Sequence, residues 1–204
     1  MKKLLAIIFL LALPICAKAQ DEGDLFLEVS GGYSYAHANF TGAGQKKSGY
    51  NGWETSFTMN PADWFNFEFD FAGRYNSSTI QLPVQLGACP PVCLPAISVD
   101  NAEHEYLFGP RFRYPKKKVS PFTHVLFGAT HVTTHATLPL TFPTFPISLS
   151  TSQTGFAMVA GGGVDLRLSK HVFWRNQVDY FLTNLFDQVE NNVRISTGFA
   201  IRFN

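Results

Sequence analysis

Bulky apolar residues alternate with mostly polar ones between Phe65 and Tyr75. A period of two predicts a β-strand with two different faces. Tilted by about 45°, these eleven residues span roughly 26 Å, which matches the apolar band of about 25 Å around an outer-membrane barrel. The pattern indicates a strand between lipid and a polar interior, and the alternative is a sandwich strand with its apolar face in a soluble core. The apolar face comprises Phe65, Phe67, Phe69, Phe71, Gly73 and Tyr75, and the other face Asn66, Glu68, Asp70, Ala72 and Arg74.

The same alternation predicts seven further strands. One of them contains Pro110, where we expect a bulge or a local gap in pairing because proline cannot donate a backbone hydrogen bond. Another, over residues 122–133, alternates less cleanly, and we place Val125, Phe127 and Ala129 outward and His124, Gly128 and Thr130 inward. The seven strands span residues 25–35, 52–59, 102–114, 122–133, 155–168, 172–182 and 193–203.

The connections between these strands alternate in length. The second, fourth and sixth are short turns, whereas the first, third, fifth and seventh are longer, notably residues 76–101 and 135–152, with residues 183–191 forming a modest seventh loop. Bacterial outer-membrane barrels have short periplasmic turns and longer external loops. We therefore predict an all-β fold, an eight-stranded antiparallel up-and-down transmembrane β-barrel. A soluble barrel of the lipocalin type is the rival, and it would need the apolar faces inside.

The first nineteen residues have the pattern of a secretory signal peptide. Two lysines precede an apolar run over residues 4–16, and Ala17-Lys18-Ala19 forms a cleavage site. The apolar run is too short for a membrane-spanning helix. A lipoprotein signal at Cys16 would need a small residue in place of Ile15. We predict a signal peptide over residues 1–19 and an outer-membrane barrel domain over residues 20–204.

Composition excludes several other classes. Charged residues make up 15% of the chain and the net charge is +1, which gives no electrostatic basis for binding nucleic acid. Cys89 and Cys93, in the sequence CPPVC, are predicted to form a disulfide in an oxidising compartment, and the alternative is two free thiols on a loop. No further cysteine or nearby histidine supports a zinc site, and we expect no metal or cofactor.

All seven arginines lie on the faces predicted to point inward, together with eight carboxylates. Arginine suits desolvated, bidentate pairing with carboxylates. Because an eight-stranded barrel is only wide enough for side chains to fill it, we predict a paired ionic plug and not an open pore. Hairpin register places Asp165 opposite Arg175 and Asp179 opposite Arg194. The predicted network comprises Glu28, Glu54, Glu68, Asp70, Arg74, Glu103, Glu105, Arg111, Arg113, Asp165, Arg167, Arg175, Asp179, Arg194 and Arg202.

Aromatic residues at the strand ends predict two interfacial girdles. The loop-end girdle comprises Tyr33, Tyr35, Trp53, Tyr75, Tyr106 and Tyr180, and the turn-end girdle comprises Tyr114, Phe122 and Phe203.

The chain resembles the small OmpA-like outer-membrane barrels, the porin-family barrel domain without a periplasmic domain. The residues that carry the resemblance are NGWETSFTMNPADWFNFEFDFAGRY, EYLFGPRFRY and the closing STGFAIRF. One departure is that Asn204 follows Phe203, whereas such chains commonly end on an aromatic residue. The resemblance implies a structural or surface-interaction role through external loops whose partner the sequence does not identify. It also implies contact with outer-membrane lipid and lipopolysaccharide, and with the barrel insertion machinery.

Two other function classes remain as alternatives. A small barrel can pass or bind small molecules in its lumen, but the charged interior disfavours this. A lipid A-modifying enzyme would need a serine or aspartate beside a histidine on the external rim. We find no such motif and predict no catalytic residue; the histidines are His37, His104, His124, His131, His135 and His171.

Overall fold

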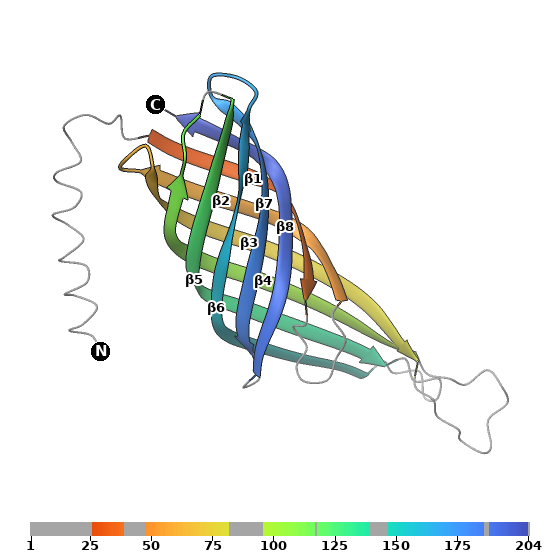
Figure 1. The fold of residues 1–204 in the computed structure, drawn as a ribbon. Coiled ribbons are helices and arrows are strands. Elements are labelled where there is room, and N and C mark those ends of the chain that lie inside the picture. The colour runs from red at the N-terminus through yellow and green to blue at the C-terminus, as the bar shows by residue number, and fades with distance from the viewer. Residues whose placement is uncertain are drawn as a thin grey trace, which may run out of the picture.

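The computed structural model is a closed barrel of eight antiparallel strands, in which each strand pairs with the next and β8 pairs with β1 (Figure 1). The predicted fold is confirmed. The strands are β1 (Phe26–Ala38), β2 (Ser48–Asn60), β3 (Phe65–Gln81), β4 (Ala96–Arg113), β5 (Val119–Leu138), β6 (Ile147–Arg167), β7 (Val172–Leu185) and β8 (Gln188–Phe203).

The structure describes residues 26–38, 48–81, 96–116, 118–138, 147–185 and 188–203. The predicted signal peptide and the predicted disulfide of Cys89 and Cys93 lie outside these residues. Within them, no helix is long and apolar enough to cross a membrane.

Strand β3 has the two faces that its alternation predicts. Phe67 and Phe69 on the outer face are each 42% exposed, whereas Asp70 and Arg74 on the inner face are fully buried. In a barrel that spans a membrane, the exposed phenylalanines contact lipid hydrocarbon. The charged side chains fill the interior instead, so the barrel places polar groups inside and apolar groups outside.

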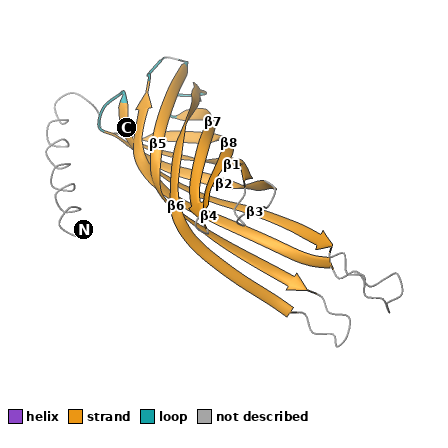
Figure 2. Ribbon diagram, turned by 60° about the horizontal axis from the view of Figure 1, so that its bottom comes forward, coloured by secondary structure: helices purple, strands orange, loops and turns teal. Residues whose placement is uncertain are grey.

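The described parts of two predicted loops are strand. The ladder between β3 and β4 continues from Tyr75↔Ala102 to Gln81↔Ala96, and that between β5 and β6 continues to Leu138↔Ile147. Strands β3 to β6 consequently extend beyond the other four as a projecting sheet (Figure 2). The seventh connection is also shorter than predicted, since Leu185 pairs with Gln188. These polar segments stay in strands because pairing satisfies their backbone groups and because their Ser, Thr, Val and Ile residues fit a pleated strand.

Pro110 interrupts one ladder without shifting its register. On one side, Pro110 pairs with Phe67 of β3. On the other side, pairing with β5 stops after Phe108↔Phe127 and resumes at Arg111↔His124. The register is the same before and after the interruption, so the predicted irregularity is a gap and not a bulge. Proline has no N–H to donate to β5 at this position.

The residues of the predicted loop-end girdle all lie on the outer face of the barrel. Their side chains are exposed at Tyr33, Trp53, Tyr75, Tyr106 and Tyr180 and half-buried at Tyr35. At the turn end, Tyr114 and Phe203 are also exposed. The prediction for Phe122 is wrong, because its side chain is only 3% exposed and lies inside the barrel. Phe122 shares the inward parity of His124 on β5, and its ring packs 3.8 Å from the Arg111 guanidinium carbon.

Candidate functional site: the sealed barrel interior

A cluster of arginines surrounds Glu28 near the turn end of the barrel. Arg111 donates to Glu28 at 3.1 Å, Arg202 donates at 2.6 Å, and Arg175 also contacts the same carboxylate. Asp165 accepts from Arg111 at 3.0 Å and from Arg175 at 2.8 Å. The guanidiniums of Arg111 and Arg175 therefore each bridge Glu28 of β1 and Asp165 of β6, which ties these strands together across the interior.

A second cluster is centred on Arg194, which is fully buried. Its guanidinium lies 2.7 Å from Asp179, 2.9 Å from Glu105 and 3.0 Å from Asp70. Glu105 also accepts from Arg74, which contacts Glu103 at 2.8 Å. Because these residues come from β3, β4, β7 and β8, the cluster crosses the barrel lumen.

His124 on β5 joins the two clusters. One ring nitrogen lies 2.9 Å from Glu68, whose carboxylate is 4.0 Å from Arg111 of the first cluster, and the other lies 2.9 Å from Asp179 of the second. A neutral imidazole has a single N–H, so both contacts can be hydrogen bonds donated by histidine only if the ring is protonated. Sequence analysis placed His124 inward but outside the network. The signal that would have found it is the excess of inward carboxylates over inward arginines.

Every predicted network residue except Arg167 lies inside the barrel, with Arg202 only partly exposed. The prediction for Arg167 is wrong. It stands at the end of β6, where its exposed side chain donates to the Ser169 carbonyl at 3.1 Å and reaches water. The two pairs predicted from hairpin register are confirmed, since Asp165 faces Arg175 at 2.8 Å and Asp179 faces Arg194 at 2.7 Å.

An apolar cluster fills the interior toward the loop end, a feature that sequence analysis missed. Leu126, Val159 and Phe181 are fully buried on the inner face. Tight apolar packing excludes water, and the cluster adds a second barrier to the ionic one. Its members are Ala36, Ala38, Tyr50, Leu107, Leu126, Val132, Ala157, Val159, Phe181 and Leu185.

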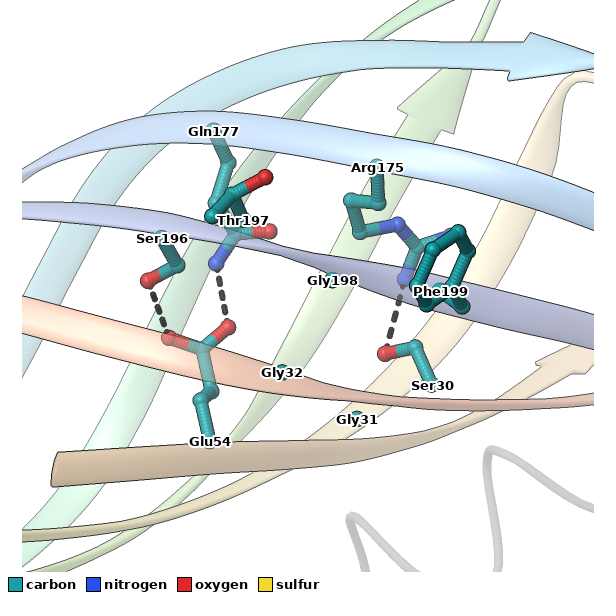
Figure 3. Close-up of a pocket in the computed structure, with 10 residues that line it drawn as sticks. All are labelled: Ser30, Gly31, Gly32, Glu54, Arg175, Gln177, Ser196, Thr197, Gly198 and Phe199. Atoms are coloured by element: carbon teal, nitrogen blue, oxygen red, sulfur yellow. Dashed lines mark hydrogen bonds between the residues drawn. The ribbon is translucent and has the colours of Figure 1, made fainter.

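A small cavity lies beside the seam between β1 and β8 (Figure 3). In it, Glu54 accepts hydrogen bonds from Gln177 and from Ser196. Gly32 and Gly198 line it where the two strands approach so closely that a Cβ atom on Gly32 would lie 2.5 Å from the Gly198 Cα. Its volume of about 20 Å³ has room for one water and for no larger ligand.

The described residues contain no group of three His, Cys, Asp or Glu side chains placed to hold a metal ion. At the loop end, His135 of β5 has Asp100 of β4 and Ser150 of β6 as its direct cross-strand partners on the outer face. His124 is buried in the ionic network, while His104 and His131 lie on the outer face. The described interior therefore consists of charged clusters and apolar side chains. It holds the water-sized cavity beside Glu54 and a larger one of about 210 Å³ at the turn end, beside Arg113 and Arg202.

The family model of the outer membrane protein β-barrel domain matches residues 5–203. The chain belongs to this family. The outer-membrane barrel therefore resides in the bacterial outer membrane, as expected from the resemblance drawn on sequence. Among curated proteins, no sequence matches this barrel.

Several solved structures share the fold of this outer-membrane barrel. Ail, the attachment invasion locus protein of Yersinia pestis, is 18% identical with a TM-score of 0.59, and the alignment covers 89% of this chain and 100% of Ail. OprG from Pseudomonas aeruginosa is 14% identical with a TM-score of 0.52, covering 91% and 99%. The outer membrane protease OmpT from Escherichia coli is 8% identical with a TM-score of 0.50, covering 91% and 100%. At these identities the likeness concerns the fold alone.

Replacing His124 by Leu is expected to lower the free energy of unfolding by about 1–3 kcal/mol, because Glu68 and Asp179 each lose a buried donor. Unfolding by denaturant in detergent micelles, followed by tryptophan fluorescence, measures the change. His131→Leu on the outer face of the same strand is the control and should shift the midpoint little. An equal effect of the two substitutions would show that His124 does not bridge the clusters.

Proposed function

We propose that this outer-membrane barrel conducts no solute and instead displays its projecting β3–β6 sheet to partners outside the cell. The single observation that carries the proposal is the continuation of these four strands beyond the rest of the barrel (Figure 2). The filled interior supports it, because ion pairs link strands across the lumen and apolar side chains pack toward the loop end. A barrel that offers no passage acts through the surface it presents.

The projecting sheet has two edges without a neighbouring strand among the described residues. The ladder between β2 and β3 ends at Asn51↔Tyr75, and beyond it the Asn76 side chain still donates to the Gly49 carbonyl of β2 at 2.7 Å. Residues 77–81 of β3 pair with β4 alone. Pairing of β7 with β6 ends at Phe156↔Asn184, so residues 147–155 of β6 pair with β5 alone. A free strand edge presents unpaired N–H and C=O groups, which bind another extended chain by strand addition.

The chemistry of both edges favours such binding. Residues 77–81 read SSTIQ and residues 147–155 read ISLSTSQTG, with no charge and no proline in either segment. Proteins that prevent strand addition usually place lysine or proline on an exposed edge. The projecting sheet therefore favours an extended polypeptide as partner. The similar barrel Ail is named an attachment invasion locus protein, which agrees with a surface-interaction role.

Selection of a displayed random-peptide library on the reconstituted protein tests this function. We expect enriched peptides to lose at least about tenfold in affinity for Ser150→Lys/Ser152→Lys, because lysines on the free edge of β6 oppose pairing. The matched control is Thr133→Lys/Thr137→Lys, which adds the same charges to the same outer face but on the interior strand β5. Absence of enrichment, or an equal loss in both variants, would contradict a role for the β6 edge.

A further inference from the structure

Positive charge has an unusual distribution over the barrel. The buried arginines lie inside, and the exposed Lys116, Lys118 and Lys170 lie in the periplasmic turns. Among the described residues of the loop-end half, the outward-facing side chains that can carry positive charge are all histidines. These are His37, His104, His131 and His135. The positive charge of this described outer surface therefore depends on pH, because imidazole gains its proton between about pH 8 and 5.

Two of these histidines form a pair. His104 of β4 and His131 of β5 are direct cross-strand partners on the outer face. Directly opposite residues have Cβ atoms about 4.5–5.5 Å apart, so one small anion can contact both rings. The Thr154 hydroxyl lies 2.7 Å from Nδ1 of His131 and that of Thr133 lies 3.4 Å from Nε2, while the Tyr75 ring packs edge-on against His104 at 6.0 Å.

The pair stands where the outer surface changes from apolar to polar. Two residues nearer the membrane centre on each strand, the outward-facing cross-strand partners are Phe71, Tyr106, Ala129 and Phe156. Four residues nearer the loop end, they are Ser77, Asp100, His135 and Ser150. The aromatic Tyr75 and Tyr106 mark this height as the membrane interface. Phosphate groups of membrane lipids lie at the same depth.

We propose that His104 and His131 bind the phosphate of an outer-leaflet lipid and that acidification strengthens this binding. Two protonated imidazoles and two hydroxyls provide the donors that a phosphate requires. The other titratable groups facing the pair are Tyr75, Tyr106 and, four residues farther out along β4 and β5, Asp100 and His135. The inference rests on the membrane location of the barrel and is independent of the proposed role of the sheet edges.

The test measures binding of lipid A, which carries phosphates, to the full protein in phosphatidylcholine nanodiscs at pH 5.5 and 7.5. We expect binding about tenfold tighter at pH 5.5, because protonation gives each imidazole a positive charge and a second N–H donor for the phosphate. His104→Gln/His131→Gln should abolish the pH dependence, and His171→Gln in a periplasmic turn should retain it. The variants keep the fold because both substituted side chains lie outside the core. Imidazole nitrogen chemical shifts of His104 and His131 provide a second readout that reports contact directly.

Two further arms separate the sources of phosphate. Lipid A stripped of its phosphates should bind without pH dependence, and inorganic phosphate at millimolar concentration should not displace the intact lipid. The proposal is overturned if binding is the same at both pH values, if the double variant binds as the wild type does, or if the stripped lipid behaves like the intact one. Full displacement by inorganic phosphate would also overturn it, since the site would then be a general anion site.

Discussion

Replacing Arg194 by Met should lower the free energy of unfolding by about 3–5 kcal/mol, because removing a buried cation leaves Asp70 without its ion pair and takes one partner from Asp179 and Glu105. Arg194 is fully buried and contacts Asp179, Glu105 and Asp70 at 2.7–3.0 Å. Within the described part of the chain, Asp70 has no other ion-pair partner. Methionine fills a similar volume, so the loss reports charge and not a cavity. Denaturant unfolding in micelles measures this loss. An unchanged dependence of the unfolding free energy on denaturant concentration checks that unfolding stays two-state.

The matched control for this substitution is Asp70→Asn. It keeps the shape of the side chain, and Arg194 retains Asp179 and Glu105. The interior also contains more carboxylates than cations, since six buried or partly buried arginines and His124 face eight carboxylates. We therefore expect Asp70→Asn to cost less than about 1 kcal/mol. Equal losses for Arg194→Met and Asp70→Asn would contradict the hub role of Arg194.

Because Arg194 contacts three carboxylates, the outcome expected of a double substitution differs from that of a single ion pair. In a strictly pairwise arrangement, adding Asp179→Ala to the Arg194 variant would restore most of the lost stability, because nothing would stay unpaired. In the structure, Asp70 and Glu105 lose the same guanidinium. The double variant should therefore recover only part of the loss. Full recovery would show that Arg194 serves Asp179 alone.

Replacing Phe69 by Arg should cost about 2–4 kcal/mol, the penalty for a charged side chain on the lipid face near the bilayer midplane. Phe69 lies in the middle of the membrane-spanning part of β3, and its side chain is 42% exposed on the outer face. Refolding into phospholipid vesicles over a denaturant series measures the cost. Tyr106→Arg near the outer interface is the depth control, where the penalty falls to about 0–1 kcal/mol. Equal costs at both positions would contradict the membrane placement of β3.

The period-two pattern predicted more than the strand count. It assigned Phe67 and Phe69 outward and Asp70 and Arg74 inward correctly. A tight turn then set the register that predicted Asp165 opposite Arg175, and symmetric pairing around residues 183–191 predicted Asp179 opposite Arg194. These features follow from local sequence, because a strand's faces and a hairpin's pairing depend on neighbouring residues.

The features that sequence analysis missed depend on distant parts of the chain. The strand extension into residues 76–81 has polar residues on both faces, so no alternation marks it. Phe122 was assigned by its position near a turn, whereas its inward packing depends on Arg111 of another strand. The bridge of His124 to Glu68 and Asp179 joins three strands, which only the closed barrel brings together. The alternation along β6 assigns Arg167 to the inward face, but Arg167 stands at the end of this strand, beyond the filled part of the interior.

Planar-bilayer recording of the purified full-length protein tests most directly the central claim, that the interior is sealed. The ionic network and the apolar cluster together predict a flat current at all applied voltages, under conditions in which a general porin in the same bilayer gives clear steps. Stable, sizeable conductance steps from this protein, present at neutral pH and proportional to the protein inserted, would contradict the sealed barrel.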